Sequence, residues 1–328
     1  MTETIIEQIR PDLFRAEIPL PRNPLKATNS YIITGKDRNL IIDTGMSRDE
    51  CRTAMLAALD QLSVDLSKTD FYVTHLHADH IGLVEELSAG DAKKYFNQPD
   101  ADILNYKDLW QIVYSLTDRH GFPAEQVRPA IESHPGQSYN PHEPIDFTMV
   151  SDGDVIRYSG YELRCIFTPG HTSGHTCLYE PHLKMFFSGD HILDDITPNI
   201  STWLEDSDPL GEYFKSLDRV YGMAIDIVLP GHRNLITDCR KRIDELKEHH
   251  RQRIDEVQEI MKQAGPSSAF EVASQMTWDI IAEGWDDFPL MQKWFATGEA
   301  LAHICHLETA GKIKKETIDQ KAIYSLVK

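Results

Sequence analysis

Long apolar runs are missing from this chain of 328 residues. No stretch of about 18 consecutive apolar residues occurs, and the mean hydropathy is -0.39. A membrane-spanning helix is therefore not expected. The first 14 residues, MTETIIEQIRPDLF, contain acidic side chains and no apolar core. This pattern predicts no signal peptide, so we expect a cytoplasmic protein without a membrane partner.

Two reactive-residue motifs are also missing. The five cysteines show no C-x-x-C spacing, which favours reduced, buried thiols. No G-x-S-x-G sequence occurs, so the chain lacks the turn that presents a serine nucleophile in many hydrolases. Any catalysis must therefore depend on other side chains.

Basic residues are too few to balance the acidic ones. The formal net charge is -19: residues 1–239 carry 20 Lys and Arg against 37 Asp and Glu, and residues 240–328 carry 13 against 15. Nucleic acids and anionic membranes attract basic surfaces, so both are disfavoured as partners. A small-molecule substrate fits this charge better.

Short β-type runs and helical stretches alternate from about residue 13 to residue 231. This alternation predicts a mixed α/β fold without a strict β-α-β rhythm. A helix is expected over residues 47–62, and a hairpin that turns at Ser159 and Gly160 is expected over residues 155–167. Further strands are expected over residues 29–34, 39–45, 71–74, 176–180, 184–190 and 226–232.

The span from about residue 90 to residue 152 interrupts this alternation and is interpreted as an insertion. It contains two helix-like pieces and a loop rich in Pro and polar residues. Such a segment can line a substrate site or simply pack as an insertion. Its aromatic residues would accordingly contact an acyl group or fill a core: Tyr106, Trp110, Tyr114, Phe122 and Tyr139.

The pattern changes after residue 239, where a second domain is expected over residues 240–328. An apolar stripe from Ile243 to Met261 predicts a long helix. The sequence SAFE at residues 268–271 predicts a capping box, and Pro289 opens a third helix. A hairpin-like end completes the outline of a winged helix. Its near-neutral charge favours a packing or homodimer module over a DNA reader.

The stretch THLHADHIGL, residues 74–83, gathers metal-binding side chains. His75, His77, Asp79 and His80 fall between a predicted strand and a predicted helix. Imidazole and carboxylate groups are the usual ligands of zinc and related metals. In an extended segment, residues two apart point the same way, so His75 and His77 can converge on one ion. The cluster therefore predicts a metal site.

Three later turns supply further candidates of the same kind. His171 lies in TPGHTSGHT, Asp190 in FFSGDHIL and His232 in VLPGH. Each follows an apolar run and a small or turn-forming residue, so each is expected at the end of a strand. Strand ends give the rigid support that a metal site requires.

The ordered motifs HLHADH, PGHTSGH, SGDH and LPGH resemble those of the metallo-β-lactamase superfamily over about residues 10–235. The C-terminal tail resembles the winged-helix appendage of a branch of glyoxalase II-like and lactamase-like hydrolases. The resemblance implies an αββα sandwich in a catalytic domain of residues 1–239, here with a helical insertion over about 90–152 and a winged-helix-like α+β module over 240–328.

The same resemblance implies a dinuclear centre for two divalent ions, with Zn²⁺ expected and Fe or Mn as alternatives. His75, His77 and His171 would hold the first ion. Asp79, His80 and His232 would hold the second, and Asp190 would bridge the two. Asp43 matches an aspartate that supports the centre from behind the ligands.

The resemblance further implies a hydrolase that uses a hydroxide between the two ions, with Asp79 and Asp190 as its catalytic carboxylates. A small thioester, ester or lactone is the expected substrate. The alternatives are a nuclease acting on RNA or another phosphodiester, and a metal-binding regulatory protein without turnover. His175 and His191 are expected to support ligands. Arg233 stands where this branch often has Gly, and it would either meet an anionic substrate or point away.

Overall fold

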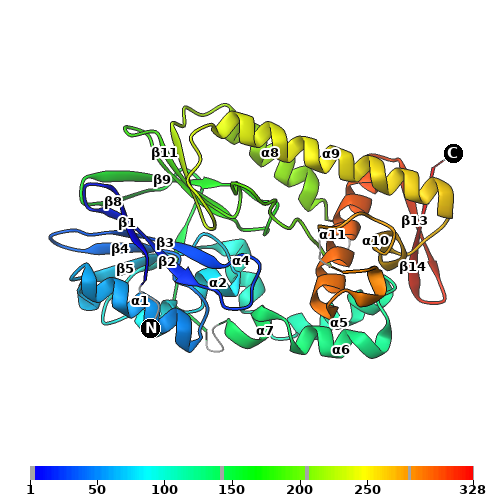
Figure 1. The fold of residues 1–328 in the computed structure, drawn as a ribbon, viewed down its shortest axis with the longest axis horizontal. Coiled ribbons are helices and arrows are strands. Elements are labelled where there is room, and N and C mark those ends of the chain that lie inside the picture. Colours follow the sequence, from blue (N-terminus) through cyan, green and yellow to red (C-terminus); the bar gives the residue numbers. More distant parts are fainter. Residues whose placement is uncertain (1–3, 141–143, 204–206, 280–281, 328) are drawn as a thin grey trace. The chain divides into compact units, whose positions relative to one another are not determined.

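The computed structural model describes residues 4–140, 144–203, 207–279 and 282–327. The chain forms two compact units, each built from several segments (Figure 1). The first unit comprises Met1–Asn105, Tyr139–Pro198 and Arg219–Ile243. The second comprises Tyr106–Ser138, Asn199–Asp218 and Asp244–Lys328. Residues 106–138, from the expected insertion, thus belong to the same unit as the C-terminal segment.

A seven-stranded sheet in sequential order forms one layer of the first unit. Its first four strands pair antiparallel, and β4 to β7 pair parallel. The strands are β1 (Ile6–Arg10), β2 (Leu13–Pro19), β3 (Ala27–Ile33), β4 (Asn39–Ile42), β5 (Thr69–Tyr72), β6 (Lys94–Asn97) and β7 (Thr148–Val150). The sequence pattern did not indicate β6 and β7, which lie inside the expected insertion.

A five-stranded sheet forms the next layer, in the order β12-β11-β10-β9-β8. Antiparallel pairs join β8 to β11, and β12 pairs parallel with β11. The strands are β8 (Val155–Tyr158), β9 (Tyr161–Phe167), β10 (Thr176–Glu180), β11 (Met185–Gly189) and β12 (Ile227–Pro230). All five correspond to runs that the sequence pattern predicts as strands.

Two apolar cores follow from the alternation of side chains along these strands. Ile33 and Ile42 of the first sheet share a core with Leu178 and Phe187 of the second. The neighbouring positions, such as Ile32, face the opposite way and pack against helices. These helices are α1 (Asp49–Gln61), α2 (Ala78–Ile81), α3 (Val84–Leu87) and α4 (Gln98–Leu104). The expected mixed α/β sandwich is therefore confirmed.

The segment that begins at Ala78, within the histidine cluster, forms two short helices, α2 and α3, where one helix is expected. Gly82 lies between them, packed closely against neighbouring backbone. A Cβ atom at this position would lie 2.5 Å from the Ser47 nitrogen and 2.5 Å from the Ala78 oxygen. Close backbone packing therefore favours glycine here, and the chain bends where the sequence suggests a continuous helix.

Helices dominate the second unit, and the sequence pattern anticipates its later elements. Ser268 and Glu271 form the predicted capping box, and Pro289 is the N-cap of the last helix. The helices are α5 (Leu109–Arg119), α6 (Ala124–Glu132), α7 (Pro135–Tyr139), α8 (Pro209–Tyr221), α9 (Cys239–Ala264), α10 (Ala269–Ala273) and α11 (Leu290–Thr309). Helices α7, α8 and α9 extend across unit boundaries. A hairpin of β13 (Ile313–Ile318) and β14 (Lys321–Leu326) closes the chain. The assignment of residues 240–328 as a winged-helix-like domain stays a prediction.

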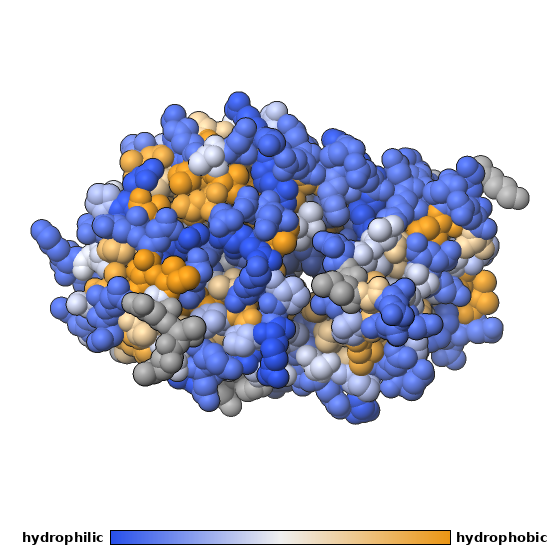
Figure 2. Space-filling model, viewed as in Figure 1, coloured by the Kyte–Doolittle hydropathy of each residue, from blue (hydrophilic) through white to orange (hydrophobic). Residues whose placement is uncertain are grey.

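The face of the molecule in Figure 2 is mostly hydrophilic, with apolar patches between the polar side chains. Within the described ranges, no helix combines the length and apolar character needed to cross a bilayer. The five cysteines are buried, as expected for thiols that fill a core.

Candidate metal centre

The seven candidate ligands lie beyond the ends of four strands of the first unit. His75 and His77 follow β5, and Asp79 and His80 lie in α2, which begins at Ala78. The other three follow β9, β11 and β12: His171, Asp190 and His232. The structure brings all seven side chains together, although they span 158 positions of the sequence, from His75 to His232.

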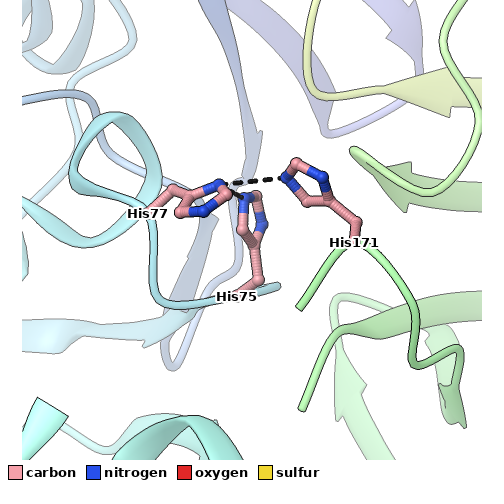
Figure 3. Close-up of side chains that lie close together, drawn as sticks. All are labelled: His75, His77 and His171. Atoms are coloured by element: carbon pink, nitrogen blue, oxygen red, sulfur yellow. Dashed lines mark hydrogen bonds between the residues drawn. The ribbon is translucent and has the colours of Figure 1, made fainter. Parts of the chain in front are cut away.

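Three imidazole nitrogens converge in the first group. The Nδ1 atom of His77 lies 3.0 Å from the Nε2 atom of His75 and 3.0 Å from the Nε2 atom of His171. Figure 3 shows the three rings with these nitrogens pointing toward one another. His75 and His77 come from one loop and His171 from another. Three convergent imidazoles suit Zn²⁺ and similar ions.

A second group combines one carboxylate with two imidazoles. The Oδ2 atom of Asp79 lies 3.4 Å from Nε2 of His232 and 3.9 Å from Nε2 of His80. All three side chains are buried. Mixed nitrogen and oxygen donors of this kind also suit zinc, iron or manganese.

Asp190 lies between the two groups. Its Oδ2 atom is 3.7 Å from Nε2 of His171 and 3.4 Å from Nε2 of His232. Its Oδ1 atom is 3.5 Å from Nε2 of His80. One carboxylate thus approaches a histidine of the first group and both histidines of the second.

Partners behind the centre fix the orientation of these rings. Nδ1 of His80 lies 2.8 Å from Oδ2 of Asp43, and Nδ1 of His232 lies 2.7 Å from the Ala27 carbonyl oxygen. The Asp43 carboxylate also accepts hydrogen bonds from the backbone and hydroxyl of Thr74, next to His75. A ring whose Nδ1 donates behind the site presents its Nε2 lone pair toward a metal.

Burial and charge move the pKa values of the rings in opposite directions. Burial lowers the pKa of His77 to about 3, and His171 acts in the same direction. Burial also lowers the pKa of His232, but Asp190 and Asp79 outweigh it and raise the pKa to about 10. The two carboxylates therefore favour a positive charge beside His232, and a bound cation would supply that charge.

Several buried polar atoms of the cluster have no hydrogen-bond partner among the described residues, and they indicate whether a metal ion would suit it. Nε2 of His80, Nε2 of His232 and Oδ1 of Asp190 are buried and lack a hydrogen-bond partner. Buried polar atoms are costly to leave without a partner. A divalent cation would satisfy all three at once, so the residues present fit a metal centre.

The supporting histidines differ in their contacts. His175 accepts a hydrogen bond at Nε2 from the Asp190 backbone, at 3.1 Å, and its Nδ1 lies 2.9 Å from the Thr168 hydroxyl oxygen. Its ring therefore holds Asp190 in place. His191 is buried, and its ring centre lies 6.1 Å from that of His175. Three groups of the described residues have ligand atoms that all lie within 4.8 Å of one another: the two groups above and the set of His75, His80 and Asp190. His191 belongs to none of them.

The Arg233 guanidinium group contacts two other segments of the first unit. The group donates to the Pro24 carbonyl oxygen at 2.8 Å and lies 3.4 Å from the Asp195 carboxylate. Its backbone has φ of 67°, a conformation that glycine adopts more readily. This backbone conformation would therefore also suit glycine at residue 233.

Two residues of the site region gave no signal in the sequence. The Asn29 side chain donates to the carbonyl oxygens of Pro230 and Arg233, both at 2.9 Å, and so holds the His232 loop. Asp100 contacts the two loops that carry the first histidine group. Both residues bond groups distant in sequence, mostly of the backbone, and no local motif marks such contacts.

Comparison with known proteins gives a consistent family relationship. Residues 23–232 match the profile of the metallo-beta-lactamase superfamily. An atrochrysone carboxyl ACP thioesterase from Aspergillus fumigatus is 27% identical over 247 residues, which cover 74% of this chain and 46% of that protein. A beta-lactamase-like protein 2 homolog from Caenorhabditis elegans is 25% identical over 254 residues, which cover 77% of this chain and 71% of that protein.

A solved structure resembles the chain over nearly its whole length. The crystal structure of a metallo-beta-lactamase family protein from Thermus thermophilus has a TM-score of 0.82 and 25% sequence identity. The match covers 98% of this chain and 100% of the other. The likeness therefore includes both units, whereas the family profile ends at residue 232.

Proposed function

The chain belongs to the metallo-beta-lactamase superfamily, and on this premise we propose that it is a dinuclear metal-dependent hydrolase of small thioesters, with esters and lactones as related substrates. The observation that carries the proposal is the buried meeting of five imidazoles and two carboxylates at strand ends, with three of their atoms lacking hydrogen-bond partners. Such a centre can activate water for hydrolysis without a serine nucleophile.

We assign the ligands by their grouping. His75, His77 and His171 would hold one ion, and a second group would hold the other: Asp79, His80 and His232. Asp190 would contact both ions, because its oxygens approach histidines of both groups. When bound, the ions, with Zn²⁺ expected and Fe or Mn as alternatives, supply Lewis acidity that makes a water acidic near neutral pH and polarises a substrate carbonyl.

The chain's own residues orient the reaction around this centre. Asp43 and the Ala27 carbonyl oxygen fix the rings of His80 and His232. His175 holds the backbone of Asp190. We assign to Asp79 the acceptance of the proton that the attacking water releases, because it is the other carboxylate at the centre. Burial of both carboxylates limits the entry of further water.

The names of relatives and the net charge of the chain support a thioester as the substrate. Relatives that align over about three quarters of this chain are named acyl carrier protein thioesterases. The aligned segments span 46% and 61% of those proteins, so their full activity is transferred here only as a proposal. The net charge of -19 also favours a small substrate over a polyanionic nucleic acid.

The aromatic residues of the expected insertion give this proposal little support. Phe122 is fully buried, and Trp110 and Tyr114 pack against the same hydrophobic core of the second unit. Tyr106 is 53% exposed. Three of these aromatic side chains thus stabilise the second unit.

A cytoplasmic location and a homodimer stay predictions.

A substrate panel tests the proposal. Zinc-loaded protein would be offered acyl thioesters of coenzyme A and glutathione, lactones, a phosphodiester and RNA. We expect thioester hydrolysis that is lost with a chelator, restored by added metal and absent from an Asp190→Ala variant. A preference for RNA or the phosphodiester would replace the proposal with the nuclease alternative. No turnover of any substrate by metal-loaded protein would support the regulatory alternative.

A further inference from the structure

Asp100 is a buried carboxylate near the start of α4, and its hydrogen-bond donors come from two other loops. Its Oδ2 atom accepts from the Leu76 backbone at 3.0 Å and from the Thr172 hydroxyl at 2.8 Å. Its Oδ1 atom accepts from the Gly174 backbone at 2.7 Å. Asp100 is fully buried. Three donors therefore converge on one carboxylate that is shielded from water, where such bonds are strong.

The two loops held by Asp100 are those that carry the first histidine group. Leu76 lies between His75 and His77, and Thr172 directly follows His171. The histidine nitrogens of these loops must stay at a fixed separation to bind one ion. A single carboxylate bonded to both loops restricts that separation.

The start of α4 gives Asp100 a firm support. The Asn97 side chain caps this helix by accepting a hydrogen bond from the Asp100 backbone at 2.9 Å. Gly174 packs directly against this cap, and a Cβ atom there would overlap the Oδ1 atom of Asn97. The histidine loop thus approaches the helix as closely as its backbone allows, which favours glycine at residue 174.

We propose that Asp100 is a positioning residue, which fixes the separation of the His75–His77 loop and the His171 loop and thereby sets the affinity of these three histidines for their metal ion. The inference rests on the proposed function only in taking this histidine group as a metal site. Asp100 acts through Leu76, Thr172 and Gly174 and is not itself a ligand.

Three variants and one matched control test this role in the full chain. Asp100→Asn retains one acceptor oxygen but turns an NH₂ group toward Gly174 or toward Leu76, where an N–H donor already lies. Asp100→Ala removes both acceptors, and Thr172→Val removes one donor. The control is Asp70→Asn: Asp70 is also buried, but it bonds Arg38, Tyr158 and the Lys93 backbone. Asp70 lies in β5 before the histidine loop, and its partners lie outside the ligand loops.

The readouts are Zn²⁺ affinity, measured by competition with a chromophoric chelator, and the visible absorption of the Co²⁺-loaded protein. We expect the dissociation constant of one Zn²⁺ to rise by roughly 10- to 100-fold in both Asp100 variants, as for other residues that orient metal ligands. Thr172→Val should cost about 2- to 10-fold, the worth of one hydrogen bond. The Co²⁺ bands should change in the Asp100 variants. Asp70→Asn should lower thermal stability and leave the affinity and the spectrum as in the wild type.

Wild-type Zn²⁺ affinity and Co²⁺ absorption in folded Asp100→Asn would overturn the inference. Equal losses of affinity in Asp70→Asn would also overturn it, because they would show a general effect of damage to the fold. If Asp100→Ala fails to fold, Asp100→Asn and Thr172→Val decide. Absence of Zn²⁺ binding by the wild type would reject both this inference and the proposed function. Zn²⁺ binding without thioester hydrolysis would reject the proposed substrate and leave the role of Asp100 standing.

Discussion

Asp43 and His80, 37 positions apart in the chain, meet through a hydrogen-bonding distance of 2.8 Å between Oδ2 and Nδ1. Both side chains are buried, and the same carboxylate accepts from Thr74. The contact keeps the Nδ1 proton of His80 behind the centre, and Nε2 therefore remains available to a metal.

This relationship predicts the effect of Asp43→Asn. An asparagine NH₂ group facing Nδ1 would favour the tautomer whose proton lies on Nε2, which cannot bind a cation. We expect the dissociation constant of one metal ion to rise by about 10- to 100-fold. Chelator competition measures this, with Asp70→Asn as the control for a buried aspartate. Unchanged affinity for both ions would mean that the Asp43 contact does not set the tautomer.

Much of the site was predictable because its candidate ligands occupy short local motifs. His75, His77, Asp79 and His80 lie within six residues, and the other three each follow an apolar strand and a small or turn-forming residue. Strand ends on the same edge of a sandwich bring such motifs together. The structure brings these seven candidate side chains together, while the assignment of each ligand to an ion stays a prediction.

The supporting contacts were not predictable for a physical reason. Asp100 follows β6, a four-residue strand within a segment interpreted as an insertion. Its partners Leu76 and Gly174 contribute backbone N–H groups, which every residue except proline possesses. A contact that uses no special side chain on the partner leaves no mark in the partner's sequence. The same holds for Asn29 and the carbonyl oxygens of the His232 loop.

Replacing Asp190 should reduce activity and metal binding far more than replacing its neighbour His191. Asp190 approaches three ligand histidines, whereas His191 lies outside the three groups of convergent donors found among the described residues. We expect Asp190→Ala to reduce kcat by more than about 100-fold and to weaken the binding of both ions. This loss exceeds the roughly 10- to 100-fold loss of affinity or activity that is typical when a residue supporting a ligand is replaced. His191→Ala should reduce kcat by less than about tenfold. Steady-state kinetics and metal analysis of both variants would decide, and equal losses would contradict this distinction.

Metal removal should lower the stability of the protein as well as its activity. Elemental analysis of gently purified protein is expected to give close to two ions per chain, because the proposed ligands divide into two sets with Asp190 between them. Ligand binding to the folded state stabilises it by about 2.7 kcal/mol at 100 times the dissociation constant. We expect chelation to lower Tm by several degrees and added Zn²⁺ to restore it. A metal content near zero, without uptake of zinc, iron or manganese, would contradict the metal site.

The C-terminal segment should not bind nucleic acid tightly. Residues 240–328 carry 13 Lys and Arg against 15 Asp and Glu, which leaves no excess of positive charge to displace phosphate counterions. Anisotropy titrations with duplex DNA and with RNA at low salt are expected to show no tight, salt-sensitive binding. A binding constant that falls steeply with salt would revive the nuclease alternative.

His120 should make the stability of the protein depend on pH. The residue is 1% exposed, and the Tyr324 hydroxyl lies 3.0 Å from its Nδ1 atom. Burial, with smaller effects of Lys315 and Arg119, lowers the pKa of His120 to about 4, whereas an unfolded histidine titrates near 6.5. The folded state therefore binds this proton less readily than the unfolded state. The stability that neutral His120 contributes is complete above pH 6.5 and is lost as the pH falls toward 4.

His120→Asn tests whether His120 makes stability fall as the pH falls, because asparagine keeps an acceptor for Tyr324 but does not titrate. We expect the wild type to lose about 2 kcal/mol more unfolding free energy than the variant between pH 8 and pH 5. Urea denaturation of both proteins at the two pH values measures the difference, and the other titrating groups cancel in the comparison. A difference of zero would show that His120 titrates alike in the folded and unfolded states. A greater loss in the variant would reverse the sign, and both results would contradict the lowered pKa of this buried ring.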